Sequence, residues 1–345
     1  MRPAELSQLL KWAIPQRFPI LIKGAPGVGK TDIVFDACSS LTVDAQGQLN
    51  GVATDLILSH PVVSDPTDFK GLPADKKDGT AHFLPYGDLA ALMHAVRPTV
   101  FFLDDLGQAS ASVQAACMQL ILARRINGHK VSDLVTFIAA TNRKSDKAGV
   151  SGILEPVKSR FKSIIELEPN NDDWCRWAIR NNMPVELIGF IRFKPELLWK
   201  FEATKEIVNT PSPRTVANVG SMQNAVIPQA LEFEVFQGAA GETFAIEYSA
   251  FLKMYRGLPD MDQIVLNPTG TAIPAENEPG IRFALAGALA ARMNDQNLGN
   301  IITYLKRLGP EIQVASLKDG VIRHPEITKT KAFVMWSTDN ANTLL

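Results

Sequence analysis

The sequence has few cysteines, and neither they nor its histidines follow the spacing of a disulfide or metal site. The three cysteines, Cys38, Cys117 and Cys175, are far apart and odd in number. This argues against a disulfide framework and for a reducing compartment. No pair of cysteines has CxxC spacing, and the five histidines form no HxxxH pattern. We therefore expect no disulfide scaffold and no zinc site.

A strong charge bias and long apolar runs are also missing. The formal net charge is −1, so the overall charge does not favour nucleic acid or a membrane surface as a partner. No uninterrupted apolar run reaches the roughly 18 residues that a membrane-spanning helix needs. Pro15 and Pro19 interrupt the N-terminal segment, which does not resemble a secretory signal. We expect a cytoplasmic protein.

The first half of the chain alternates short apolar segments with segments of helical period. The expected strands are Phe18–Lys23, Asp55–Ser59, Thr99–Leu103, Val135–Ala140 and Ser163–Leu167, and the expected helices are residues 4–14, 30–41 and 109–124. Strands that alternate with helices predict an αβα sandwich with a mainly parallel five-stranded sheet. From about residue 170 only helical periodicity remains. We therefore expect an α/β domain over 1–170, a helical lid over 171–225 and a mainly helical extension of the lid over 226–345.

A glycine-rich loop follows the first expected strand. Gly24–Thr31, GAPGVGKT, matches GxxxxGK[ST] in full and lies between a strand and a helix, which is the context of a P-loop NTPase. Gly24, Gly27 and Gly29 let backbone N–H groups turn towards phosphate oxygens. Lys30 places a positive charge on the phosphates, and the Thr31 hydroxyl is a ligand for Mg²⁺. The sequence therefore predicts binding of ATP and Mg²⁺ by Gly24, Ala25, Pro26, Gly27, Val28, Gly29, Lys30, Thr31 and Asp32.

Two carboxylates stand at the end of the third expected strand, in TVFFLDD. Asp104 is the expected second magnesium residue, which acts largely through water, and Asp105 is the expected group that orients and polarises the attacking water. The alternative is an ordinary turn at a strand end, where Asp is common.

The segments GAPGVGKT, VFFLDDL, TFIAATNR, SRF and SPRTV, in this order, resemble the AAA+ ATPases. The resemblance is closest to the MoxR-like branch, which includes CbbQ, NorQ and the gas-vesicle ATPases, and it covers about residues 15–220. It implies that Asn142 is the sensor-1 residue, that Arg160 is the arginine finger that reaches a neighbouring subunit, and that Arg214 is sensor 2, acting in cis or in trans. The alternatives are an Asn in a strand-end turn and two surface arginines.

The resemblance further implies a hexameric ring that remodels or activates another protein in a chaperone-like way. The partner in this branch often carries a von Willebrand factor A domain. The polar segment Asp65–Leu84 is then a candidate for the pore or upper face of the ring, or else an ordinary surface loop. The family usually has Asp-Glu where this chain has Asp104 and Asp105. The side chain of Asp105 is one methylene shorter, so we expect ATP binding with slow turnover.

Two other functions stay open for this sequence. A nucleic-acid motor or loader uses the same ATP core, but the near-neutral charge and the lack of a helix-turn-helix, a zinc finger or a Lys/Arg-rich arm speak against it. An ATP-gated scaffold with little turnover is supported by Asp105 alone. A small-molecule kinase shares the phosphate loop but leaves the series Asn142, Arg160 and Arg214 unexplained.

Overall fold

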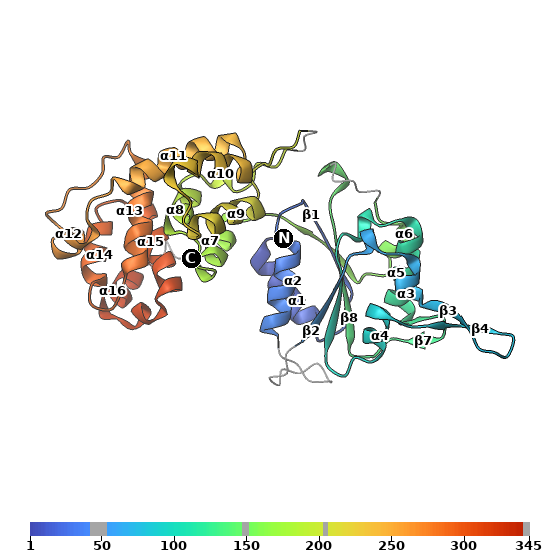
Figure 1. The fold of residues 1–345 in the computed structure, drawn as a ribbon. Coiled ribbons are helices and arrows are strands. Elements are labelled where there is room, and N and C mark those ends of the chain that lie inside the picture. Colours follow the sequence, from blue (N-terminus) through green and yellow to red (C-terminus); the bar gives the residue numbers. More distant parts are fainter. Residues whose placement is uncertain (42–53, 147–151, 203–205, 341–345) are drawn as a thin grey trace. The chain divides into compact units, whose positions relative to one another are not determined.

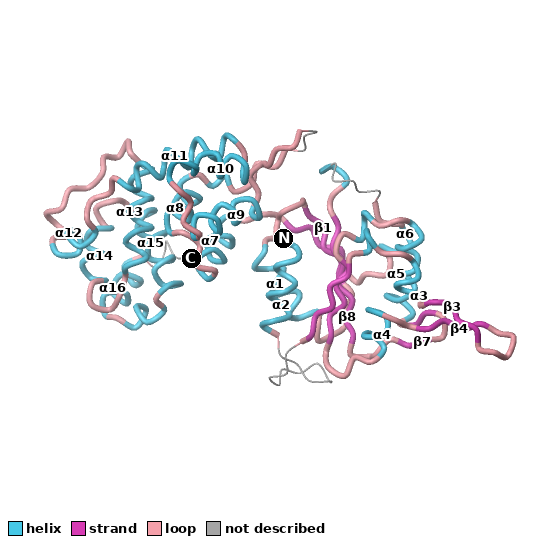
Figure 2. The backbone as a smooth tube through the Cα atoms, viewed as in Figure 1, coloured by secondary structure: helices cyan, strands magenta, loops and turns pink. Residues whose placement is uncertain are grey.

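The computed structural model describes residues 1–41, 54–146, 152–202 and 206–340. They divide into two compact units, Met1–Pro169 and Asn170–Leu345. Figure 2 shows that the first unit combines strands and helices, whereas the second is helical in its described part. The chain was expected to divide at residues 170 and 225, and a separate subdomain beginning after residue 225 stays a prediction.

The first unit is built on a five-stranded sheet with the order β2-β5-β8-β1-β9. Its strands are β1 (Ile20–Gly24), β2 (Asp55–Ser59), β5 (Thr99–Leu103), β8 (Val135–Thr141) and β9 (Ser163–Leu167). All neighbouring strands are parallel. The expected five-stranded sheet is confirmed. It was expected to be mainly parallel, and in the structure it is wholly parallel. The carboxyl ends of all five strands therefore meet at one edge, where ligands bind in such sheets.

Helices cover both faces of this sheet (Figure 1). Successive side chains of a strand point to opposite faces, and β1 follows this rule. Ile20 and Ile22 pack against helices α1 and α2, whereas Leu21 belongs to the core beneath α5. The helices of this unit are α1 (Pro3–Ala13), α2 (Lys30–Ser40), α3 (Pro66–Lys70), α4 (Gly87–Met93), α5 (Ala111–Ala123) and α6 (Glu155–Lys158).

The polar segment Asp65–Leu84 contains more regular structure than its sequence pattern indicates. After α3 the chain forms an antiparallel hairpin of β3 (Leu72–Asp75) and β4 (Ala81–Leu84), which projects from the sheet domain in Figure 1. A second, shorter hairpin joins β6 (Arg125–Ile126) to β7 (His129–Lys130). His129 Nε2 lies 2.6 Å from the carbonyl oxygen of Phe83, so a hydrogen bond links the two hairpins.

The second unit contains two apolar cores that share helix α13. One core lies among α7 to α11 and the other among α12 to α16, and α13 packs against both α8 and α15. The helices are α7 (Asn171–Arg180), α8 (Val185–Phe193), α9 (Pro213–Asn224), α10 (Glu232–Ala240), α11 (Glu242–Arg256), α12 (Met261–Leu266), α13 (Pro279–Arg292), α14 (Leu298–Leu305), α15 (Pro310–Arg323) and α16 (Lys331–Asp339).

A buried ion pair connects two of these helices. Arg192 on α8 lies 2.6 Å from Asp319 on α15, and their side chains are 15% and 6% exposed. Arg192 also contacts Asp172 at the start of α7. In neither unit is any helix of the described ranges both long and apolar enough to span a lipid bilayer.

Candidate functional site

The glycine-rich loop joins the end of β1 to the start of α2. Gly27 and Gly29 have φ values of +75° and +95°, a region that side chains with a Cβ rarely adopt. Gly29 is the N-cap of α2 and offers no side chain to cap its first N–H groups. These N–H groups and the positive end of the helix dipole favour a bound anion. The local backbone is thus suited to hold phosphate.

Lys30 lies in the first turn of α2 and is only 7% exposed. Its ammonium group donates hydrogen bonds to the carbonyl oxygens of Gly24 and Ala25, both at 3.0 Å. It donates a third, at 2.7 Å, to Oδ1 of Asn142. These acceptors offset the cost of burying the charge. They also hold the ammonium group against the loop and beside the end of β8.

The acidic pair at the end of β5 lies against the start of α2. The Thr31 hydroxyl donates a 2.6 Å hydrogen bond to Oδ2 of Asp104, whose side chain is buried. The other carboxylate oxygen, Oδ1, accepts from the backbone N–H of Asp105 at 3.0 Å. Because both oxygens accept hydrogen bonds, the carboxylate of Asp104 has a fixed orientation beside the Thr31 hydroxyl.

Asp105 occupies a strained position. Its backbone is left-handed, with φ +56° and ψ +31°, a conformation that Asp and Asn tolerate better than most residues with a side chain. Nδ2 of Asn142 donates to Oδ1 of Asp105 at 3.4 Å. Asn142 therefore bridges Lys30 and Asp105. Besides the loop carbonyls of Gly24 and Ala25, hydrogen bonds connect Lys30, Thr31, Asp104, Asp105 and Asn142 into one cluster.

The turn after Asp105 fits closely against β8. A Cβ on Gly107 would lie 2.1 Å from Oγ1 of Thr141, which is far inside van der Waals contact. The absence of a side chain at Gly107 thus permits the turn that carries Asp105 to reach the strand end that carries Asn142.

Three further predicted residues, Asp32, Arg160 and Arg214, lie outside this cluster. Asp32 is exposed in the first turn of α2, where a carboxylate interacts favourably with the helix dipole. Arg160 follows α6, and its guanidinium donates to the Ser159 hydroxyl at 3.1 Å. Arg214 is exposed at the second residue of α9, in the other unit. Their proposed roles stay predictions.

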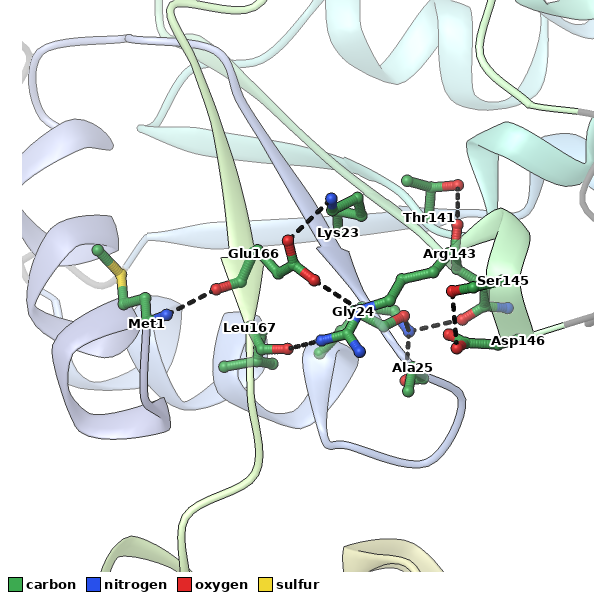
Figure 3. Close-up of polar contacts among 12 residues, drawn as sticks. Met1, Lys23, Gly24, Ala25, Thr141, Arg143, Ser145, Asp146, Glu166 and Leu167 are labelled. Carbon is green, nitrogen blue, oxygen red and sulfur yellow. Dashed lines mark hydrogen bonds and ion pairs between the residues drawn. The ribbon is translucent and has the colours of Figure 1, made fainter. Parts of the chain in front are cut away.

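Three charged residues beside the cluster were not expected from the sequence. Lys23, Arg143 and Glu166 line a cavity of about 390 Å³ together with Asn142, and Figure 3 shows the three side chains turned toward one another. Lys23 and Glu166 are charges within short apolar strands, ILIKG and SIIEL. A charged residue inside a short apolar strand is the feature of the sequence that could have drawn attention to them. The order of strands in the sheet cannot be read from the order along the chain, so the sequence does not show that Lys23 and Glu166 are neighbours.

The donor set fits ATP with magnesium. Mg²⁺ takes oxygen ligands, keeps several waters and is commonly held by one or two side chains together with substrate phosphates. The Thr31 hydroxyl and the Asp104 carboxylate form such a pair. Within the described ranges no group of three or more His, Cys, Asp or Glu residues could hold a metal ion.

Two solved structures show distant similarity to this chain. RuvB from Thermotoga maritima, described as a Holliday junction branch migration motor, is 17% identical, with a TM-score of 0.38 over 89% of this chain and 87% of that one. NtrX from Brucella abortus is 13% identical, with a TM-score of 0.39 over 92% of this chain and 67% of that one. Among curated proteins no sequence matches significantly.

A protein-family model supplies the more specific result. Residues 20–169 match the AAA family, the ATPase family associated with various cellular activities. The match begins at β1, includes all the clustered residues and ends with the first unit. Residues 20–169 of this chain therefore form an AAA ATPase domain.

Proposed function

We propose that this protein is a MoxR-like AAA+ ATPase that binds Mg-ATP and hydrolyses it in an oligomeric ring, to remodel or activate a partner protein. The observation that supports this most is the hydrogen-bonded cluster at the carboxyl edge of the sheet. It joins Lys30, Thr31, Asp104, Asp105 and Asn142 from three separate parts of the sequence. Each has the side chain that phosphoryl transfer to water requires.

Binding rests on the loop and on the start of α2. The backbone N–H groups of Gly24–Thr31 hold the phosphates, and Lys30 exchanges carbonyl partners for phosphate oxygens. The Thr31 hydroxyl and the Asp104 carboxylate would hold magnesium. Magnesium, when bound, neutralises charge on the phosphate oxygens.

Hydrolysis rests on Asp105 and Asn142. Asp105 orients the attacking water and accepts its proton, while Asn142 donates to Oδ1 of that carboxylate and keeps it beside Lys30. The carboxylate of Asp105 reaches one methylene less far than the Glu usual in the family. A shift of about 1 Å in the reacting atoms can cost roughly a hundredfold in rate. We therefore propose slow turnover.

The ring makes Arg160 and Arg214 part of the mechanism. Arg160 of one subunit stabilises negative charge on the phosphates bound by its neighbour, and Arg214 contacts phosphate in cis or in trans. The proposed assembly is a cytoplasmic hexamer, and the proposed partner is a protein that carries a von Willebrand factor A domain. The three cysteines are free and buried, which agrees with a reducing compartment.

The test is ATP turnover by the purified protein with and without magnesium. We expect slow, magnesium-dependent turnover, and Asp105→Asn should lower it by about two orders of magnitude or more, as removal of a general base does. Turnover by Asp105→Asn that equals the parent's would remove Asp105 from the mechanism. ATP binding without measurable turnover in the parent would favour a nucleotide-gated scaffold instead.

Light scattering with ATP, ADP and no nucleotide tests the ring. We expect a hexamer that is favoured by ATP, and a monomer under all conditions would contradict the role of Arg160. Arg160→Ala should lower turnover without loss of ATP binding. Stimulation of turnover by DNA would point to a nucleic-acid motor rather than to a protein-remodelling ATPase.

A further inference from the structure

An ion-pair cluster lies on the sheet directly beside the nucleotide site. The carboxylate of Glu166 on β9 is shared by two cations, Lys23 Nζ at 2.9 Å and Arg143 Nε at 2.8 Å. Arg143 also donates from its guanidinium to the carbonyl oxygen of Leu167 at 3.4 Å. Figure 3 shows Lys23, Arg143 and Glu166 converging at the strand ends.

The two cations are each one peptide bond away from a site residue. Lys23 precedes Gly24, the first residue of the phosphate loop, and Arg143 follows Asn142. In the sheet, β1 lies between β8 and β9, and Lys23 is in register with Glu166. Glu166 therefore connects the base of the phosphate loop with the end of β8 through two short ion pairs.

This cluster is poorly placed to contribute to overall stability. The side chains of Lys23 and Glu166 are 41% and 43% exposed, and exposed ion pairs contribute little to the free energy of unfolding. The apolar cores on both faces already hold the sheet together. The hydrogen bond from Lys23 and then the charge of Arg143 lower the pKa of Glu166, so its carboxylate is ionised at neutral pH.

Small displacements at this point nevertheless matter for the chemistry. Asn142 is hydrogen-bonded to both Lys30 and Asp105. Its distance from the phosphate loop depends on the relative positions of the carboxyl ends of β1 and β8. Reaction rates are sensitive to shifts of about 1 Å in the reacting groups. The ion pairs of Glu166 can thus add little to the free energy of unfolding and still have a large effect on the alignment of Asn142 with the phosphate loop.

We propose that Glu166 is a positioning residue, which acts through Lys23 and Arg143 to fix the separation of the phosphate loop and Asn142. This inference rests on the proposed ATP hydrolysis. It assigns no contact with ATP to Glu166, so it predicts an effect on kcat with little effect on nucleotide affinity.

The experiment compares Glu166→Gln with the matched control Asp55→Asn. Asp55 pairs with Arg97 at 3.0 Å and is 42% exposed, nearly the same as Glu166, but it lies at the amino end of β2, away from the site. We expect Glu166→Gln to lower kcat by about tenfold, as a sub-ångström misalignment does, with the Kd for ATP within about twofold. The two variants should have the same Tm, and Asp55→Asn should keep the parent's kcat.

A double-mutant cycle on kcat then tests whether Glu166 acts through its partner. Lys23→Gln, Glu166→Gln and the double variant should all lose about the same factor, because the residues act as one unit. Additive losses, an unchanged kcat in Glu166→Gln, or a fall in its Tm that Asp55→Asn does not show would each overturn the inference. Failure of the parent itself to hydrolyse ATP would instead contradict the proposed function.

Discussion

The hydroxyl of Thr31 donates a 2.6 Å hydrogen bond to Oδ2 of Asp104, although 73 residues separate them in the sequence. The bond joins the start of α2 to the end of β5. It places a hydroxyl oxygen and a carboxylate side by side, the two protein groups expected to hold magnesium. A magnesium ion would be held through an oxygen lone pair of Thr31, so its O–H could still donate to Asp104, and this hydrogen bond would keep the hydroxyl oriented for the ion.

Asp104→Asn should therefore weaken nucleotide binding only when magnesium is present. Loss of one charge-assisted interaction of about 1.5–3 kcal/mol corresponds to a roughly 10- to 150-fold rise in the Kd for Mg-ATP. Titration with a fluorescent ATP analogue, in magnesium and in EDTA, measures this. Asp36→Asn, on the exposed face of α2, is the control and should leave both values unchanged. An equal loss of affinity in EDTA would show that Asp104 does not act through the metal.

Gly107→Ala should displace the turn that carries Asp105. The new Cβ would lie 2.1 Å from Oγ1 of Thr141, and such overpacking costs typically about 1–3 kcal/mol in the free energy of unfolding. We expect lower ATP turnover and lower stability, measured by kcat and by urea denaturation.

The compensating change for Gly107→Ala is Thr141→Ala, which removes the clashing hydroxyl. The double variant should recover most of the turnover. Thr141→Ala alone is measured as the control, because it shows how much turnover is lost when only that hydroxyl is removed. If the double variant is no better than Gly107→Ala, the close approach of Gly107 to Thr141 does not position Asp105.

Arg192→Met should strongly destabilise the second unit. It leaves Asp319, 6% exposed, as a buried carboxylate without its cation, which costs about 3–5 kcal/mol. The double variant Arg192→Met with Asp319→Leu should lose much less, because an apolar pair can replace a buried ion pair.

Urea denaturation followed by tryptophan fluorescence measures the loss at Arg192. A Trp12→Phe background is useful because Trp12 is the one tryptophan of the first unit. Arg292→Met is the control, since its pair with Asp262 is largely exposed, and it should change stability by no more than about 0.5 kcal/mol. Equal losses for Arg192→Met and Arg292→Met would contradict a buried role for Arg192.

The three cysteines should be unreactive in the folded protein. Burial raises the pKa of Cys38, Cys117 and Cys175 from 9.0 to about 12, and only the thiolate reacts with alkylating reagents. Iodoacetamide at pH 8 should label none of them in the native state and all of them in denaturant, as mass spectrometry can measure. Rapid native labelling of any one would contradict its burial.

The same pKa shifts make stability depend on alkaline pH. In the unfolded chain the thiols ionise near pH 9.0, whereas in the folded chain they stay neutral until about pH 12. The stabilisation from these neutral thiols is therefore complete below pH 9.0 and is lost as the pH rises towards 12. The Tm should fall over this range, and a variant with Cys117→Ala should show a smaller fall.

Several strands were predictable because their ends are marked in the sequence. Asp55–Ser59, Thr99–Leu103 and Ser163–Leu167 have the predicted bounds. The first strand was expected from Phe18 but begins at Ile20, and the intervening Pro19 has no N–H to contribute to the sheet. The helix expected from residue 109 begins at Ala111, because the Ser110 hydroxyl caps it by accepting from the N–H of Val113.

Features that depend on long-range pairing could not be predicted. The strands of the hairpin Leu72–Leu84 are short and mostly exposed, and one contains Pro73, so no apolar alternation marks them. Glu166 meets Lys23 and Arg143 only because β1 lies between β8 and β9. The loop Gly24–Thr31 was predictable because its glycines and Lys30 carry the chemistry in one contiguous segment. For Arg160 and Arg214 the motif alone carries the prediction.

The three acceptors around Lys30 have a consequence for how nucleotide binding is sensed. The ammonium group is already hydrogen-bonded to Gly24, Ala25 and Asn142. A phosphate oxygen must therefore compete with these acceptors for the N–H groups of Lys30. The contribution of Lys30 to nucleotide affinity is then the difference between its hydrogen bonds to phosphate and its hydrogen bonds to these protein acceptors. This contribution is smaller than that of a lysine whose ammonium group had no protein acceptors. In the proposed function phosphate oxygens replace the two carbonyl partners, and the hydrogen bond from Lys30 to Asn142 would then connect the bound nucleotide with the end of β8.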